Sequence, residues 1–266
     1  MWAILRPLRG CLLVALWAAC SSGSGAEEIK RLPRLFLIGD STVRNNTAGQ
    51  VGWGTPIAAF FDASRIKVEN RALAGRSSRT FLTEGLWEKV LKDIQPGDYL
   101  LMQFGHNDGG GLKDPKGRAS LKGAGEETQE VMKDGKNEVV HTYGWYLRRY
   151  VRDAKSKGAI PVVLSLIPRN MWQGEKVNRA SRDYGKWARE SAEAEGALFV
   201  DLNEIVAKRY EADGKEKVQT AYFDPADHTH TKAEGARVNA ECVVAGLREL
   251  NDCPLAAYLL PQANAR

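Results

Sequence analysis

The chain has 266 residues, 43% of them hydrophobic and 27% charged, which suits one globular α/β domain with a sizeable core and excludes a disordered protein. It carries 38 Lys and Arg against 33 Asp and Glu, so its formal net charge is +5. Without Arg6 and Arg9, the only charged residues before Glu27, the balance is +3, which is too small for a nucleic-acid-binding protein.

Residues 1–26 have the pattern of a secretory signal. A basic start is followed by an apolar run from Cys11 to Ala19 and then by small polar residues. The apolar run is too short to cross a bilayer as a stable helix. We therefore expect cleavage before Glu27, export to the periplasm or the medium, and one mature domain over residues 27–266.

A lipoprotein signal is the second interpretation of this segment. Residues 17–20, Trp-Ala-Ala-Cys, resemble a bacterial lipobox, although Trp17 stands where such boxes usually carry leucine. Cleavage would then fall before Cys20, and a lipid on this cysteine would anchor the protein to a bacterial membrane. Neither interpretation includes a membrane span.

Apolar runs and turn signals predict that strands and helices alternate along the rest of the chain. Strands are expected at Leu35–Ile38, Ile66–Glu69, Tyr99–Phe104, Ile160–Ile167 and Leu198–Val200. Helices are expected at Pro56–Phe61, Leu86–Leu91, Glu138–Lys157, Arg182–Glu195, Leu202–Ala212, and from a capping box of Thr231 and Glu234 to about Leu250. Residues 109–135 have no clear period and read as a long insertion. This order predicts a parallel sheet covered by helices on both faces.

A polar cluster follows the first predicted strand. The run Leu35–Ile38 reads as a strand buried on both faces, and Gly39 permits a tight turn after it. Asp40 and Ser41 then fall at the carboxyl end of the strand, where open α/β sheets bind their ligands. A serine presented there is a candidate nucleophile, provided that a base reaches it.

The loop before the last helix offers that base. Asp227 and His230 are three residues apart, and in a turn this spacing lets the carboxylate reach the imidazole. The carboxylate could then fix the tautomer and leave the other ring nitrogen facing Ser41. His228 is a competitor that only geometry can exclude.

Two other loops offer donors for the oxyanion that acyl transfer develops. Gly75 allows a backbone N–H to approach closely, Asn107 offers a side-chain amide, and the Ser41 N–H adds a third donor. The plainer interpretations are a turn glycine at position 75 and an Asx-turn at position 107.

These four blocks, taken in order, resemble those of the SGNH, or GDSL-like, hydrolases. The blocks are Gly39-Asp40-Ser41, Gly75, Gly105-His106-Asn107-Asp108 and Asp227-His228-Thr229-His230. Thr42 stands in place of the leucine usual in the first block. The Gly-Asp-Ser-Thr version, residues 74–81 and Asp-His-Thr-His are similar to the rhamnogalacturonan acetylesterases of carbohydrate esterase family 12.

The resemblance covers about residues 35–250 and implies a flavodoxin-like three-layer α/β/α sandwich with a five-stranded parallel sheet. It implies Ser41 as nucleophile, His230 as base, Asp227 as its partner, and an oxyanion hole formed by Ser41, Gly75 and Asn107. It also implies a serine esterase, without a cofactor, that removes acetyl groups from a plant cell-wall polysaccharide, most closely rhamnogalacturonan.

Several loop residues suit an acidic sugar polymer. Arg76 and Arg79 follow the predicted oxyanion glycine, and Arg169 follows the fourth predicted strand, so these arginines are expected on the face that carries the serine. A guanidinium can grip a carboxylate with two hydrogen bonds. Trp53 and Trp172, on loops of the same face, could stack on sugar rings. The alternative is that the arginines pair with acids of the protein and the tryptophans fill gaps.

Other functions stay open at this stage. An acetylated xylan could replace the pectic substrate. A metal-dependent phosphoesterase is a further alternative, with ligands drawn from Asp40, His106, Asp108, His228 and His230. That hypothesis leaves the serine and the oxyanion glycine without roles. We expect no metal, no nucleic acid partner and a monomer, and Cys242 and Cys253 are either a disulfide or two free buried thiols.

Overall fold

The structure is a computed structural model that describes residues 1–2, 31–113, 117–133 and 135–261. The chain divides into two compact units, Met1–Arg31 and Leu32–Arg266, and every described helix and strand belongs to the second. The cleavage sites predicted before Cys20 and Glu27 lie outside the described residues. In the part that is described, no helix is both long and apolar enough to cross a membrane.

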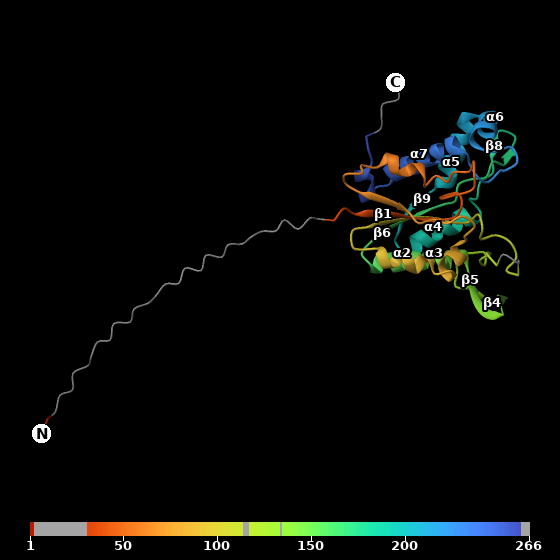
Figure 1. The fold of residues 1–266 in the computed structure, drawn as a ribbon. Coiled ribbons are helices and arrows are strands. Elements are labelled where there is room, and N and C mark those ends of the chain that lie inside the picture. The colour runs from red at the N-terminus through yellow and green to blue at the C-terminus, as the bar shows by residue number, and fades with distance from the viewer. Residues whose placement is uncertain (3–30, 114–116, 134, 262–266) are drawn as a thin grey trace. The chain divides into compact units, whose positions relative to one another are not determined.

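A five-stranded parallel sheet forms the centre of the second unit, in the strand order β2-β1-β3-β6-β9 (Figure 1). Its strands are β1 (Arg34–Gly39), β2 (Lys67–Asn70), β3 (Tyr99–Gln103), β6 (Ile160–Leu164) and β9 (Leu198–Val200). Every residue of β3 is buried, as is β1 after Arg34. Strands buried on both faces read as continuous apolar runs, which is why the sequence revealed them.

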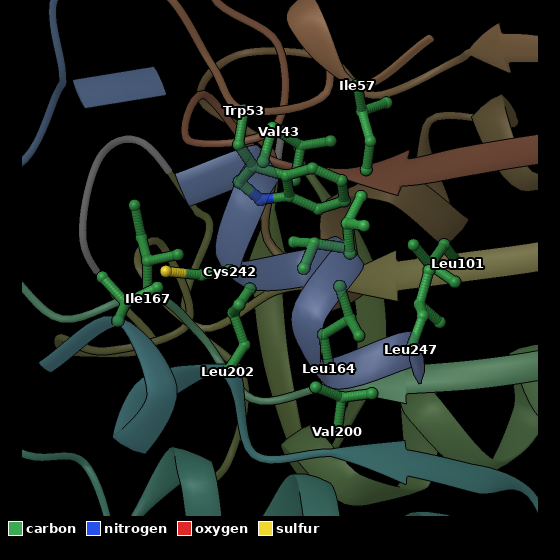
Figure 2. Packing of buried hydrophobic residues seen from close by; sticks show 14 of the residues in the cluster. Val43, Trp53, Ile57, Leu101, Leu164, Ile167, Val200, Leu202, Cys242 and Leu247 are labelled. Atoms are coloured by element: carbon green, nitrogen blue, oxygen red, sulfur yellow. The ribbon is translucent and has the colours of Figure 1, made fainter. Parts of the chain in front are cut away.

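Successive side chains of each strand point to opposite faces of the sheet and divide the core in two. Leu35 and Leu37 of β1 pack on the face covered by α5 (Leu202–Asp213) and α7 (Ala233–Glu249). Leu101 of β3 and Leu247 of α7 belong to the same cluster (Figure 2). Burial of each such side chain contributes about 1.5–3 kcal/mol, which makes this two-residue alternation the main determinant of the layers.

The opposite face packs Phe36 and Ile38 against a second group of helices. These are α1 (Ser78–Thr83), α2 (Leu86–Asp93), α3 (Tyr143–Ser156) and α4 (Tyr184–Ala194). Helices therefore cover both faces of the sheet (Figure 1), and the predicted three-layer α/β/α class with a five-stranded parallel sheet is confirmed. The remaining elements are η1 (Pro56–Phe60), α6 (Lys215–Lys217), η2 (Val218–Tyr222), η3 (Pro254–Tyr258), and the hairpins β4–β5 (Thr128–Lys133, Lys136–His141) and β7–β8 (Trp172–Gln173, Lys176–Val177).

The prediction of one helix over Glu138–Lys157 is wrong at its start. Residues up to His141 belong to β5, which pairs antiparallel with β4, and α3 begins only at Tyr143. The Thr142 hydroxyl accepts a hydrogen bond from the Trp145 N–H and caps the helix. Two consecutive valines before this cap favour a strand. The end of the insertion predicted at residues 109–135 is therefore half of a hairpin.

Two smaller predictions are settled by side-chain contacts. The capping box predicted for Thr231 and Glu234 is wrong, because α7 has Lys232 at its N-cap and the Thr231 hydroxyl donates to the Val51 carbonyl instead. Cys242 and Cys253 are free and buried, so no disulfide joins them. Burial raises the pKa of the Cys242 thiol to about 12, which keeps it protonated.

Candidate active site

Close contact between β1 and its neighbours sets the position of Ser41. A Cβ at Gly39 would lie 2.4 Å from the Gln103 carbonyl oxygen and 2.5 Å from a Val43 methyl, so only glycine allows the chain to turn here. Gly39 also pairs with Gln103 in the sheet register. The residues that follow β1 and β3 are consequently brought side by side, which places Asp40-Ser41 near Asn107.

A buried chain of hydrogen bonds supports this turn from below. Asp40 Oδ1 accepts from the Thr42 N–H and hydroxyl, at 2.8 and 2.7 Å. The Thr42 hydroxyl accepts from Gln103 Nε2 at 2.7 Å, and Gln103 Oε1 accepts from Trp53 Nε1 at 2.8 Å. Trp53 is fully buried, so the prediction that it stacks on a sugar is wrong. Its indole supports the turn that carries Ser41.

The structure brings Ser41, His230 and Asp227 together. The Ser41 Oγ lies 2.9 Å from His230 Nε2, and His230 Nδ1 lies 2.7 Å from Asp227 Oδ2. Both distances are within the range that a nucleophile, its base and the base's carboxylate require. Among the described residues, His228 makes no such contact with Ser41. Its backbone carbonyl accepts a hydrogen bond from the Asn170 N–H, and the residue lines a different cavity, which Asp227 also lines. Geometry thus excludes the competing histidine.

The Asp227 carboxylate is held in place by several donors. Oδ1 accepts from the backbone N–H groups of Thr229 and His230, at 2.7 and 3.0 Å, and Oδ2 also accepts from Gln50 Nε2 at 3.0 Å. Burial opposes ionisation, but the hydrogen bonds from His230 and from these two backbone groups lower the pKa of Asp227 to about 2. The carboxylate is therefore charged at neutral pH. Sequence reasoning missed Gln50, which lies 177 residues away in the chain.

The predicted oxyanion donors border the same site. Among the described residues, no acceptor binds the backbone N–H groups of Ser41 and Gly75. Gly75 has a φ of +78°, a conformation that favours glycine. Asn107 Nδ2 donates to the Arg76 carbonyl at 3.0 Å, which orients the amide and leaves its second hydrogen available.

These groups line a cavity of about 390 Å³ that contains Ser41, Gly75, Asn107, Arg169 and His230. A second cavity of about 340 Å³ adjoins it and shares the residues His106 and Arg169. Both volumes fall in the range of small-molecule sites. The reacting groups therefore face open space on one side.

The remaining residues predicted to bind substrate differ in their placement. Arg79 is fully buried, pairs with Glu138 through two hydrogen bonds of 2.7 and 2.8 Å, and cannot reach a ligand, so that prediction is wrong. Arg76 pairs with Glu84 and does not line the cavity. The Trp172 indole donates to Asn170 and packs against the core, away from both cavities. Arg169 alone of the five lines the site.

The five proposed metal ligands point to different partners. His106 lies 3.6 Å from Asp40 Oδ2, while Asp108 accepts hydrogen bonds from Ser78 and Ser120. Burial opposes the charge of Asp40, but His106 and the donors of Thr42 outweigh it and lower the pKa of that carboxyl. Over the described residues, no group of three or more His, Cys, Asp and Glu side chains is arranged to hold a metal ion.

The fold and the site define a class. A nucleophile-base-carboxylate arrangement at the carboxyl end of a parallel sheet, with donors from two neighbouring loops, is the arrangement of an α/β serine hydrolase. Residues 37–238 match the GDSL-like Lipase/Acylhydrolase family, and the chain belongs to this family of SGNH hydrolases.

Within this family, the chain is similar to several individual proteins. The chain is 35% identical over 207 residues to a rhamnogalacturonan acetylesterase of Emericella nidulans, covering 78% of this chain and 81% of that protein. It is 31% identical over 221 residues to the probable rhamnogalacturonan acetylesterase YesY of Bacillus subtilis, covering 81% and 93%. The crystal structure of YxiM from Bacillus subtilis superposes with a TM-score of 0.66 at 26% identity, over 82% of this chain and 56% of that one.

Proposed function

We propose that the protein is a serine esterase that removes acetyl groups from an acidic plant cell-wall polysaccharide, most closely rhamnogalacturonan. The observation that carries the chemistry is the series of hydrogen bonds from Ser41 through His230 to Asp227 beside an open cavity. The similarity to proteins named rhamnogalacturonan acetylesterase supports the acetyl group and the sugar polymer. We also propose that the protein acts as a monomer and needs no cofactor.

The first half of the reaction forms an acetyl-serine. His230 Nε2 takes the Ser41 proton while Oγ attacks the acetyl carbonyl carbon, and the imidazolium is stabilised by Asp227. The carbonyl oxygen becomes an oxyanion that accepts hydrogen bonds from the Ser41 and Gly75 N–H groups and the Asn107 amide. His230 then gives its proton to the sugar oxygen, and the bond between that oxygen and the acetyl carbon breaks.

The second half hydrolyses this intermediate. His230 takes a proton from a water molecule, whose oxygen attacks the acetyl carbon of the acyl-serine. The same donors hold the second oxyanion. When the bond to Ser41 Oγ breaks, His230 returns the proton to the serine, and acetate leaves. The enzyme is restored, so one ester and one water yield one free hydroxyl group, one acetate and one proton.

Reagents can separate serine chemistry from metal chemistry. A phosphonylating reagent directed at serine should abolish acetate release, with the label on Ser41, and a chelator should leave the rate unchanged. Ser41→Ala should lower kcat by about 10⁶-fold, the loss seen when a serine nucleophile is removed. Loss of activity in EDTA that a divalent ion restores would refute the serine mechanism.

Acetate release from a panel of acetylated polysaccharides tests the substrate. The highest kcat/KM is expected on acetylated rhamnogalacturonan, because binding energy from the neighbouring sugars assists the reacting centre. Small acetyl esters lack those contacts and should be poorer substrates. A clear preference for acetylated xylan would overturn the pectic assignment and leave the esterase mechanism intact.

We further propose that the protein is exported by the signal over residues 1–26. The basic start, apolar run and small polar residues of this segment support the proposal. Mass spectrometry of the native N-terminus should find either a free Glu27 or a lipid on Cys20. An intact Met1 on protein from the exporting host would refute export by either route.

A further inference from the structure

Two arginines beside Ser41 have no carboxylate partner among the residues that the structure describes. Arg118 Nη1 donates to the Gly75 carbonyl at 3.3 Å. Arg169 donates to the Thr229 hydroxyl and, at 3.4 Å, to the His106 carbonyl. Both line the cavity that contains the serine. Among the described residues, every hydrogen-bond partner of these two guanidinium groups is neutral.

The other predicted arginines behave differently. Arg76 pairs with Glu84 at 2.8 Å and Arg79 pairs with Glu138 at 2.7 Å. Neither lines the cavity. Among these four arginines, only Arg118 and Arg169 line the cavity, and in the described residues neither of them is paired with a carboxylate.

The protein partly shields both guanidinium groups from solvent, since both arginines are partly buried. Burial lowers the pKa of Arg169, and the more distant charges of Asp40 and Asp227 oppose that effect without forming ion pairs with it. Those two carboxylates are already bound, Asp40 by Thr42 and Asp227 by His230. The cavity consequently offers, close to the nucleophile, two guanidinium groups that form no ion pair with any described residue.

We propose that Arg118 and Arg169 form a binding site for a uronic acid carboxylate of the polymer that lies close to the acetyl ester. The proposal rests on the proposed function, since it places the carboxylate and the acetyl ester on one polymer. A guanidinium offers a planar fork of donors that matches a carboxylate.

The alternative is that both arginines only hold loops. Arg118 contacts the carbonyl of the oxyanion glycine, and Arg169 joins the loops that carry His106 and Thr229. Loss of a purely structural contact would slow hydrolysis of every ester by a similar factor. Loss of a carboxylate site would slow hydrolysis of the charged substrate only. The ratio of kcat/KM for a charged substrate to kcat/KM for a neutral one therefore separates these roles.

The experiment compares acetylated rhamnogalacturonan with the same polymer after its carboxyl groups are reduced to primary alcohols. Arg118→Gln and Arg169→Gln should each lower the ratio of kcat/KM for the acidic polymer to that for the neutral polymer by about 10- to 100-fold, the worth of a charge-assisted hydrogen bond. The corresponding lysine variants should recover part of the ratio, because they keep the charge and lose the fork. Added salt should lower the wild-type ratio.

Arg44→Gln is the matched control. Arg44 is exposed, donates to the Asn70 carbonyl at 3.2 Å and does not line the cavity, so removal of its charge should leave the ratio at the wild-type value. If both arginines hold one carboxylate, the variant with both changed to glutamine should lower the kcat/KM ratio by less than the product of the two single fold-changes.

The outcomes are distinguishable. An equal loss on both polymers, or a ratio near one in the wild-type enzyme, would overturn the carboxylate site while the esterase stands. Failure of the wild-type enzyme to release acetate from either polymer, or full activity in Ser41→Ala, would overturn the proposed function and this inference with it.

Discussion

Replacement of Asp227 by asparagine tests the contacts around His230. In the wild-type protein Oδ1 accepts from two backbone N–H groups and Oδ2 accepts from His230 Nδ1. An asparagine keeps both backbone bonds only if its oxygen takes the Oδ1 position, which turns its NH₂ group toward the imidazole. Gln50 can rotate its amide to accept from that NH₂. The histidine must then present Nδ1 as an acceptor and carry its proton on Nε2.

This tautomer cannot act as a base toward Ser41, because the proton on Nε2 faces the serine oxygen. We expect Asp227→Asn to lower kcat by about 10⁴-fold, the loss known for this change in a serine protease triad and equal to about 5 kcal/mol of transition-state stabilisation. The fold should survive. Since the pKa of Asp227 is lowered from 3.8 to about 2, the lost charge removes at most about 2 kcal/mol of stability at neutral pH.

Acetate release under saturating substrate measures kcat, and thermal unfolding confirms that the variant is folded. Asp224→Asn is the control, because this exposed carboxylate lies in the same loop and accepts only from the Ala226 N–H. A folded Asp227→Asn enzyme within tenfold of the wild-type kcat would show that the carboxylate neither fixes the tautomer nor stabilises the imidazolium.

Three other outcomes are expected. Asn107→Ala should lower kcat by about 10²–10³-fold, the loss typical of one oxyanion donor, and a loss confined to KM would contradict that role. His230→Ala should abolish acetate release, whereas His228→Ala should be mild; the reverse order would refute the assignment of the base. Burial, with the charge of Asp40 adding, raises the pKa of Asp108 to about 7 against hydrogen bonds from Ser78 and Ser120. The folded state then keeps a proton on Asp108 that the unfolded state loses near pH 3.8. The free energy of unfolding, measured in urea, should therefore fall by up to about 4 kcal/mol between pH 4 and 7. Asp108→Asn should flatten this dependence on pH.

The sequence revealed the sheet well because burial on both faces leaves a direct signature. Leu35–Ile38 of β1 and residues 99–102 of β3 are uninterrupted apolar runs, and Gly39 and Gln103 follow them. The hairpin β4–β5 left a weaker signature, since most of its side chains are exposed and their polarity resembles that of a loop. Only contact with the rest of the domain fixes such a segment as a strand.

The candidate site was predictable as far as chain order determines it. Parallel strands end at one edge, so the loops that hold Ser41 and Asn107, which follow β1 and β3, had to converge there. The loop that holds His230 follows η2 and not a strand, so strand order alone does not place it. The direction in which a long side chain points depends on packing instead. Arg79 lies four residues after Gly75, yet it turns inward to Glu138, a residue 59 positions further along the chain. Arg118, which lines the cavity, was not predicted there because its segment has no periodic pattern to place it.

Thr42 shows how one departure from the family pattern is tied to residues far away in sequence. A leucine at this position could not donate to Asp40 or accept from Gln103 Nε2. A buried amide left without its partner costs about 1–3 kcal/mol, so threonine here requires a polar partner on β3, and that glutamine in turn satisfies the indole of Trp53. A hydrogen bond to Asp40 also helps to keep this buried carboxylate charged beside His106. The threonine of the first block, the glutamine of β3 and the tryptophan therefore form one unit, and the position of Ser41 depends on all three.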